Sequence, residues 1–515
     1  MKNLIFKIIT LVLISGFSFG LFAQTATIED VRRREFRGIS PILNESNNLV
    51  EGYYSFYITA KESKGMRNFV FALFDKNLKL IKNTSISITK RSMMDASSYN
   101  GKYFLFVFND PLKKSIYYIT VDRKGNIIKR VDETADKIRL ATSDVYAADD
   151  GFFLIKPIKE KKNGYEIEKV DEQLNIQWNK KFVPEKGIIS VEAIESSGDK
   201  IFVIQKVAPS ILNQKSSKGE LVCLASNSGD ILFNYPLFDG TVTCQPSSFL
   251  IDKDKNIVVG GMYFDGERWD NVNSDGIFFL SLNELGEKVA FSTMSWKDGL
   301  QYSLKDTEGS LRIGSKPKVI FHEITQYKDG SYQVIGETFQ KNLNLLPRGI
   351  ADVRSAITGL YIGDMSEQGM ITTLEIMDFI LFNFSTEGKI TSLYNLPKEN
   401  TKVYLYPPYT TAGGLYLAKL LKAYGMFNFG FTIKRNNNGE DQNLLVSRNL
   451  TKKDRNIRIQ NLDPKKRSEE INIPLEKKWV KGYIGVAPNT DNKICIYFYN
   501  QKEKKVSLKL ESFDL

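Results

Sequence analysis

The chain has 515 residues, of which 42% are apolar and 12% aromatic, and its formal net charge is +11. This composition excludes an intrinsically disordered protein, because a chain so rich in apolar residues can bury a substantial core. The excess of Lys and Arg gathers near the C-terminus, and we interpret it as solvated charge on strand edges and turns. A patch for anionic glycans or a membrane surface is the alternative.

Residues 1–24 predict a secretory signal peptide. Lys2 and Lys7 form a basic start, residues 8–22 are apolar, and Ala23 precedes a plausible cleavage point. An uncleaved anchor is the alternative, although an apolar stretch of about 15 residues is shorter than the roughly 20 that span a bilayer. We therefore expect an exported protein in the periplasm or outside the cell, with no other membrane-spanning segment and no nucleic-acid partner.

Two stretches of the chain repeat the same pattern of turns and apolar strands. Residues 254–261 and 275–287 form one copy, and residues 329–336 and 378–389 form the second. Each copy has a turn rich in Gly, Asn and Asp, an apolar strand, a loop, a second apolar strand and another such turn. Repeats of this size predict a β-propeller built from four-stranded blades. We expect residues 25–515 to form a single propeller domain.

The same pattern can be followed through eight units, with seven as the alternative count. Strands are numbered outward from the propeller axis. Second strands are expected at residues 53–59, 102–108, 151–155, 200–205, 256–260, 331–336, 415–419 and 493–499. Third strands are expected at residues 68–74, 115–121, 166–170, 221–225, 277–282, 379–384, 444–447 and 506–510. The chain ends just after the last third strand, so we predict that an N-terminal strand from residues 25–38 completes the final blade.

The connections between second and third strands are long in four consecutive units. They cover residues 206–219, 261–275, 337–377 and 420–441. In a propeller these loops emerge on one face, which predicts a ligand-binding face, whereas drift in tolerant loops is the alternative. Within the insertion at 337–377, residues 349–360 carry apolar side chains at helical spacing and predict a short helix on the rim.

Few residues of the sequence are candidates for catalysis, metal binding or a disulfide. His322 is the only histidine, and the sequence contains no catalytic or phosphate-binding motif, so we expect a structural histidine and no cofactor. Three Cys with one His make a metal site improbable. A disulfide between Cys223 and Cys244 is one expectation, and buried thiols are the alternative.

One predicted loop combines acids, an arginine and a tryptophan. These residues suit a sugar or another ligand, because an aromatic ring beside hydrogen-bonding carboxylates can hold a sugar by stacking and polar contacts. An ordinary polar loop is the alternative. The candidate ligand-binding residues are Asp265, Glu267, Arg268, Trp269, Asp270 and Asp275.

The unit D-x-N-I-V-V-G-G, followed by D-G-I-F-F-L-S-L-N-x-x-G-E, resembles the repeats of secreted bacterial β-propeller proteins. The signal ending in Phe22, Ala23 and Gln24 and the composition rich in Lys, Asn and Ile are similar to exported proteins of Bacteroidota, whose propeller-like families are uncharacterised. The resemblance implies a fold and a location outside the cytoplasm, and it supplies no catalytic residues.

We therefore expect a non-enzymatic binding or scaffold protein whose long-loop face engages an envelope protein or a glycan. A carbohydrate-active enzyme that uses the acids of residues 265–275 is one alternative. A structural subunit of a cell-envelope complex is the other. The sequence leaves the oligomeric state open.

Overall fold

The computed structural model describes most of the chain after the predicted signal peptide. The described residues are 24–44, 49–59, 65–134, 144–159, 163–210, 217–268, 274–297, 318–345, 370–405, 414–423, 425–437, 440–450, 455–463, 466, 469–476, 483–490 and 492–515. Residues 1–23 of the predicted signal and the helix expected at 349–360 lie outside these ranges.

The described chain is almost entirely antiparallel β-sheet, organised in units of four strands. Units 1 to 4 contain β2 (Val31–Leu43), β3 (Val50–Thr59), β4 (Met66–Asp75) and β5 (Leu80–Thr89); β6 (Met93–Tyr99), β7 (Tyr103–Asp110), β8 (Ser115–Asp122) and β9 (Ile127–Thr134); β10 (Asp144–Ala148), β11 (Gly151–Lys159), β12 (Asn163–Val170) and β13 (Ile176–Phe182); and β14 (Ile188–Ser197), β15 (Lys200–Ala208), β16 (Lys218–Ala225) and β17 (Ile231–Pro236). A single parallel bridge between Asn163 and Ile188 joins units 3 and 4 into one sheet.

Units 5 to 8 continue the pattern and include the additions that matter for the site. They contain β18 (Val242–Ile251), β19 (Ile257–Asp265), β20 (Gly276–Leu282) and β21 (Lys288–Ser295); β22 (Val319–Gln326), β23 (Tyr332–Leu345), β24 (Met370–Phe384) and β25 (Ile390–Leu396) with a fifth strand β26 (Thr401–Leu405); β27 (Phe429–Asn437), β28 (Glu440–Leu450), β29 (Arg455–Asn461) and β30 (Glu470–Pro474); and β31 (Tyr483–Pro488), β32 (Lys493–Asn500) and β33 (Lys505–Ser512) with β1 (Thr25–Ile28). The helix α3 (Gly414–Ala423) lies between units 6 and 7 along the chain.

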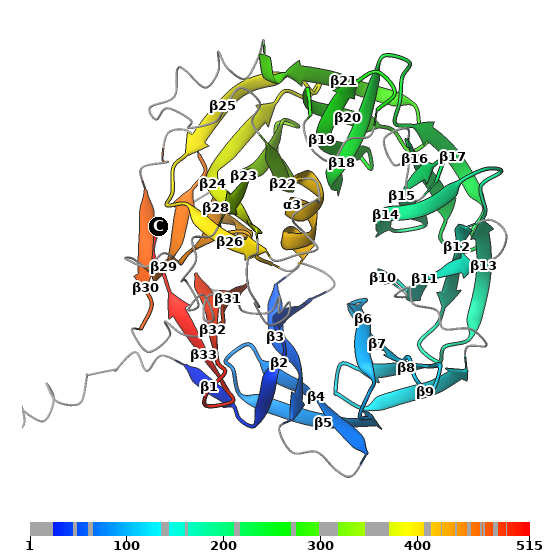
Figure 1. Ribbon diagram of the computed structural model, residues 1–515. Helices are drawn as coiled ribbons and strands as arrows, with labels where there is room; N and C mark the ends of the chain where they lie inside the picture. The colour runs from blue at the N-terminus through cyan, green and yellow to red at the C-terminus, as the bar shows by residue number, and fades with distance from the viewer. Residues whose placement is uncertain are drawn as a thin grey trace, which may run out of the picture.

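Figure 1 shows the units following one another around a ring, with β6, β10, β14, β18 and β22 on its inner side. The helix α3 lies inside the ring, close to β22. Because each unit is an antiparallel meander, the connections from second to third strands emerge at one end of the sheet. The turns from third to fourth strands emerge at the other end.

The two ends of the chain meet in unit 8. The N-terminal strand β1 pairs antiparallel with β33, from Thr25 opposite Lys509 to Ile28 opposite Val506. The hydroxyl of Tyr499 donates to the carbonyl of Arg32 at 2.9 Å and so ties the start of unit 1 to β32. This pairing confirms the prediction that an N-terminal strand supplies the missing fourth strand of the last unit.

The turn between the third and fourth strands has the same geometry in five units. A side-chain oxygen of its first residue accepts the backbone N–H groups two and four positions later; these first residues are Asp75, Asp122, Asp171, Asn283 and Ser385. Three positions after it φ is positive, at Leu78, Gly125, Leu174, Gly286 and Gly388. The sequence indicated turns rich in Gly, Asn and Asp, which tolerate such conformations at Gly125, Gly286 and Gly388. The positive φ of Leu78 and Leu174 has no such local signal.

Turns between third and fourth strands, including the one in unit 4, also join neighbouring units, because they pack against the unit that precedes them. A side chain of the preceding unit donates a hydrogen bond to a turn carbonyl; the donor and acceptor residues are Thr84 and Gly125, Thr120 and Glu172, Trp178 and Ser226, and Ser292 and Gly388. The glycines lie so close to the preceding unit that a Cβ on Gly286 would come within 2.4 Å of the Phe233 ring. The turns therefore contribute to the seams between units as well as reversing the chain.

The core is divided among these seams. Between units 1 and 2, the ring centroids of Phe56 and Phe106 lie 4.7 Å apart and those of Phe71 and Phe104 lie 4.6 Å apart. All four side chains are buried. Second strands such as β7 are apolar on both faces because a neighbouring unit covers each face.

Unit 7 differs from the prediction. The second strand expected at residues 415–419 is part of helix α3, and the expected third strand at 444–447 lies in β28, which is the second strand. The long loop expected at 420–441 contains the end of α3 and the inner strand β27. The prediction failed because a short apolar run fits a strand and one face of a helix equally well.

Candidate functional site

The inner strands share an irregularity that changes what they present toward the middle of the ring. In five units the pairing of the first and second strands shifts once, which leaves one residue of the first strand without a partner. These bulged residues are Asp95, Glu192, Ser247, His322 and Gly430. The pairing of β2 with β3 shifts at three places. Bulges reorient side chains and carbonyl groups and are frequent beside functional sites, which makes the inner side of the ring a candidate site.

Helix α3 covers part of this inner side. Leu415, Leu417, Ala418 and Leu421 are buried in a cluster with side chains from β19, β22, β23, β24 and β26. The same helix carries Lys419 and Lys422, both partly buried. Gly425, with φ of 63°, follows the helix and suits the left-handed conformation that commonly ends one. The apolar face therefore fixes the helix on units 5 and 6 and directs two lysines toward the bulges.

Both lysines contact bulged residues or their neighbours. The ammonium group of Lys422 donates to the carbonyls of Ser247 at 3.1 Å and Phe321 at 2.5 Å. Lys419 lies 3.5 Å from a carboxylate oxygen of Glu192, which Lys206 approaches to 3.1 Å. Helix α3 is thus joined to units 4, 5 and 6 through polar contacts at the inner strands.

Burial and neighbouring charges shift the pKa values of Glu192 and Lys422. Burial opposes ionisation of Glu192, but Lys419 and Lys206 outweigh it and hold its pKa below the usual value. Burial and, to a smaller extent, the nearby charge of Lys419 together lower the pKa of Lys422 to about 8. The arrangement is therefore a salt-bridged anchor with one lysine close to neutrality at mildly alkaline pH.

Two further carboxylates lie on neighbouring inner strands. Asp144 on β10 and Glu195 on β14 keep a large exposed fraction, but partial burial still raises the pKa of each. The two strands are joined where the hydroxyl of Ser196 donates to the carbonyl of Ala147 at 2.8 Å. Sequence reasoning missed both acids, because nothing in their local pattern distinguishes them from turn and edge carboxylates.

His322 lies on β22 in a fully enclosed polar cluster. Its Nε2 is 3.1 Å from Glu337, and its ring stacks on Phe429 with centroids 4.7 Å apart. Glu337 also pairs with Lys398 at 3.1 Å and accepts the backbone N–H of Asn428 at 3.2 Å. Burial keeps the pKa of His322 below its ordinary value despite the carboxylate beside it. The contacts support the expected structural role, in which the cluster fastens unit 6 to unit 7.

The predicted ligand loop is held together by its own residues. Asp275 pairs with Arg268 at 2.7 Å and accepts the backbone N–H of Asp265 at 3.0 Å. Glu267 pairs with Lys218 at 3.2 Å, and the Arg268 guanidinium lies over the Phe264 ring.

The structure therefore brings Asp265, Arg268 and Asp275 together and directs Glu267 toward the neighbouring unit 4. Trp269 and Asp270 lie outside the described residues.

The cysteines do not form the bridge that was one of two expectations. Cys223 on β16 and Cys244 on β18 are both free and buried, as is Cys495. Cys223 and Cys244 pack in the apolar seam between units 4 and 5. Burial raises the pKa of Cys223 to about 12, so its thiol stays protonated. The thiols act as small apolar side chains, which was the alternative expectation.

Two features are absent from the described residues. Within these ranges, no group of three or more His, Cys, Asp or Glu side chains is placed to hold a metal ion. Likewise, none of the helices described is long and apolar enough to cross a membrane.

An all-β chain of antiparallel sheets with a helix anchored on its inner strands is the class of protein that these observations define. The chain belongs to a family of unknown function, DUF6770, whose model matches residues 2–514. No curated protein matches it.

Several solved structures are similar to the chain at low sequence identity. A DUF4221 family member from Bacteroides vulgatus is 10% identical, with 95% of this chain and 97% of that chain covered and a TM-score of 0.28. A subtype N10 neuraminidase-like protein of A/little yellow-shouldered bat/Guatemala is 9% identical, with 82% and 94% covered and a TM-score of 0.30. A Synechocystis apocarotenoid oxygenase is 9% identical, with 71% and 64% covered and a TM-score of 0.26. At these TM-scores the likenesses carry no argument about function.

Proposed function

We propose that the chain is an exported, non-enzymatic binding protein built as a single eight-bladed β-propeller. Eight four-stranded units in chain order around a ring and the pairing of β1 with β33 support the blade count. The signal-like residues 1–24 support export.

One observation carries the binding role: units 5 and 6 are built out at the end where second and third strands connect. The strands β23 and β24 extend together as far as the pair Leu345 and Met370, β26 adds a strand beside β24, and α3 packs over them. We call these extensions, β26, α3 and residues 266–268 and 274–275 the built-out sector. A rigid platform that positions loops is a common basis for recognition.

The ligand is a protein or a glycan of the cell envelope, engaged by the exposed polar rim of this sector. Glu267 and Lys402 are exposed there, and both form ion pairs with partners that are themselves partly exposed. Such pairs cost little to exchange for contacts with a ligand, because exposed ion pairs contribute only about 0–1 kcal/mol to stability.

The test compares two double charge reversals. The mature chain is assayed on a glycan array and against envelope extract, beside Glu267→Lys/Lys402→Glu in the sector and Lys124→Glu/Glu387→Lys on turns at the opposite end. We expect the sector variant to lose binding and the control to keep it. Equal binding by both variants would exclude the built-out sector as the binding surface.

A carbohydrate-active enzyme remains the second candidate because of Asp144 and Glu195, whose raised pKa values suit a general acid. The acids of residues 265–275 favour this role less, since Asp275 is held in an ion pair with Arg268. Polysaccharide turnover that Asp144→Asn abolishes would establish the enzyme, and unchanged turnover would exclude this pair.

A structural envelope subunit is the third candidate. The first residue of the fourth strand is an exposed apolar side chain in four consecutive units: Leu80, Ile127, Ile176 and Ile231. Such a belt suits contact with another protein. The part of the 337–377 insertion expected to carry a short amphipathic helix lies outside the described residues.

A further inference from the structure

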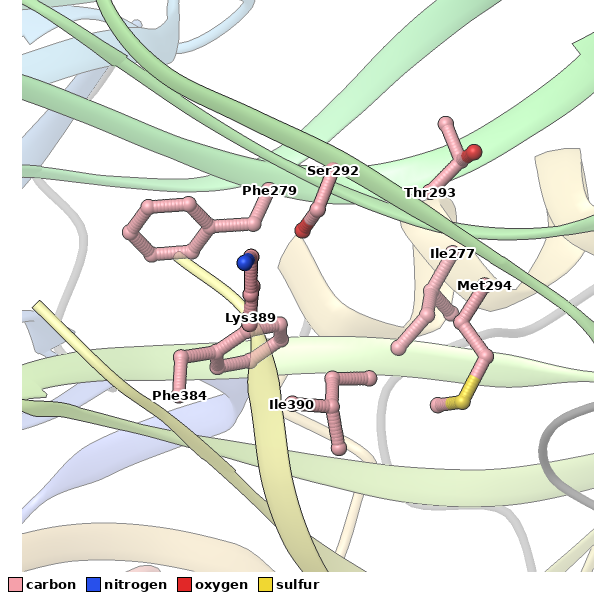
Figure 2. Close-up of a pocket in the computed structure, with 8 residues that line it drawn as sticks. All are labelled: Ile277, Phe279, Ser292, Thr293, Met294, Phe384, Lys389 and Ile390. Carbon is pink, nitrogen blue, oxygen red and sulfur yellow. The ribbon is translucent and has the colours of Figure 1, made fainter. Parts of the chain in front are cut away.

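A pocket of about 240 Å³ lies at the outer part of the seam between units 5 and 6 (Figure 2). Its apolar walls come from both units, and its polar lining is limited to three side chains. The lining residues are Ile277, Phe279, Met294, Phe384 and Ile390, with Ser292, Thr293 and Lys389. Lys389 is the single charged residue among them, and Figure 2 shows its nitrogen on the side of Phe279 and Ser292.

The neighbouring seam explains why there is a pocket here. Tyr235 on β17 lies opposite Leu221, and Ser292 on β21 lies opposite Phe279. Leu221 stands two residues before Cys223 and Phe279 two residues before Ser281, and a bulge follows Cys223 and Ser281 in their hairpins. Tyr235 and Ser292 therefore occupy equivalent positions. The hollow lined by Tyr235 between units 4 and 5 measures only about 20 Å³. A serine in place of a tyrosine thus leaves the seam between units 5 and 6 open.

The pocket is held open by the contact that joins the two units. The Ser292 hydroxyl donates to the carbonyl of Gly388, and Gly388, with φ of +73°, packs so tightly that a Cβ would lie 2.4 Å from the Phe279 ring. Phe279 and Phe384 are buried and stack with ring centroids 4.9 Å apart. Strands and a turn form these walls, so a ligand would meet a rigid site that requires no ordering.

Size, polarity and charge together define the ligand. An apolar cavity of about 150 Å³ accommodates benzene, so 240 Å³ accommodates a ring with a short side arm. Apolar walls with a few placed polar groups are typical of small-molecule sites, and the Lys389 ammonium suits a carboxylate. We propose that this pocket binds a small molecule with one aromatic ring or short acyl chain and one carboxylate, which faces Lys389.

The test uses 3-phenylpropionate and the neutral 3-phenylpropanol, each titrated calorimetrically into the mature chain. We expect both to bind and the acid to bind about two- to fivefold more tightly, because an exposed charge contributes little. Lys389→Ala should remove that difference and retain the alcohol. Ser292→Tyr, which copies unit 4, should abolish binding of both.

The outcomes that overturn the proposal are equally definite. Absence of saturable binding of either probe up to about 10 mM, the weak limit for so small a ligand, would exclude the site. Wild-type affinity in a folded Ser292→Tyr variant would place the ligand elsewhere. Should that variant fail to fold, Met294→Phe fills the pocket from another wall and gives the same comparison. The sector variant Glu267→Lys/Lys402→Glu should bind both probes normally, so this result is separate from the proposed function.

Discussion

Replacing Gly286 by alanine tests how neighbouring units are joined. Gly286 has a φ of 80°, and a Cβ added there would lie 2.4 Å from the Phe233 ring of the preceding unit. Alanine would therefore meet two separate difficulties, an unfavourable backbone conformation and a clash across the seam. Gly198 offers a matched control, since its φ is 57° and nothing lies within 4 Å of an added Cβ.

The backbone strain and the clash together set the expected loss of unfolding free energy. The left-handed conformation costs an L-residue about 1–2 kcal/mol, and crowding in a packed seam costs about 1–3 kcal/mol more. Alanine also restricts the unfolded chain, which returns about 0.4–1 kcal/mol. Gly286→Ala should lower the free energy of unfolding by about 2–4 kcal/mol, whereas Gly198→Ala should lower it by about 1 kcal/mol or less.

Urea unfolding of the mature chain, followed by tryptophan fluorescence, measures both variants. A double-mutant cycle with Phe233→Leu then isolates the contact, because a smaller side chain at 233 should relieve part of the Gly286→Ala penalty. Equal losses for Gly286→Ala and Gly198→Ala, with no coupling to position 233, would refute the claim that the turn packs on the preceding unit.

Three further outcomes are expected. Lys422 has a pKa of about 8 in the folded chain and a higher pKa when unfolded, so the unfolded chain binds more protons between about pH 8 and 10.5. The contribution of this group to stability therefore rises with pH in that range. Lys422→Met should flatten the rise of the urea midpoint with pH, and an unchanged pH profile would contradict the burial of the ammonium. Glu337→Gln should cost about 3–5 kcal/mol in the same assay, because it leaves a buried lysine without its carboxylate, and a loss below about 1 kcal/mol would count against the enclosed cluster. Cys223, Cys244 and Cys495 should resist alkylation in the native protein and all react after unfolding under non-reducing conditions; one reactive thiol there would indicate a disulfide.

The sequence predicted well what depends on local chemistry. The turns beginning at Asp122 and Asn283 follow from side chains that accept nearby N–H groups and from residues that tolerate positive φ. Apolar runs such as β7 follow from burial on both faces. The unfinished last unit even predicted the pairing of β1, because a sheet edge needs a partner.

What the sequence could not predict depends on contacts between distant segments. The run Leu415 to Leu421 became a helix because the surfaces of β19 and β24 cover one of its faces, which no local pattern shows. The meeting of Lys419 with Glu192 links residues far apart in the chain, and the bulges that arrange such contacts leave no clear mark in the sequence. One signal was available and missed: at equivalent positions of the fourth strand, unit 5 has Ser292 where unit 4 has Tyr235.

The most direct test of the ring and its closure is a disulfide between β1 and β33. Thr27 lies opposite Ser507, and the hydrogen bond from Leu510 N–H to the Gln24 carbonyl makes theirs a non-hydrogen-bonded pair, whose Cα atoms are close enough to bridge. Oxidation of Thr27→Cys/Ser507→Cys should give a monomeric bridge linking the two ends of the chain, found by peptide mass mapping, and should raise the unfolding midpoint. Failure to form that bridge in the folded monomer, or the same yield from an out-of-register Thr27→Cys/Lys505→Cys pair, would contradict closure by the N-terminal strand.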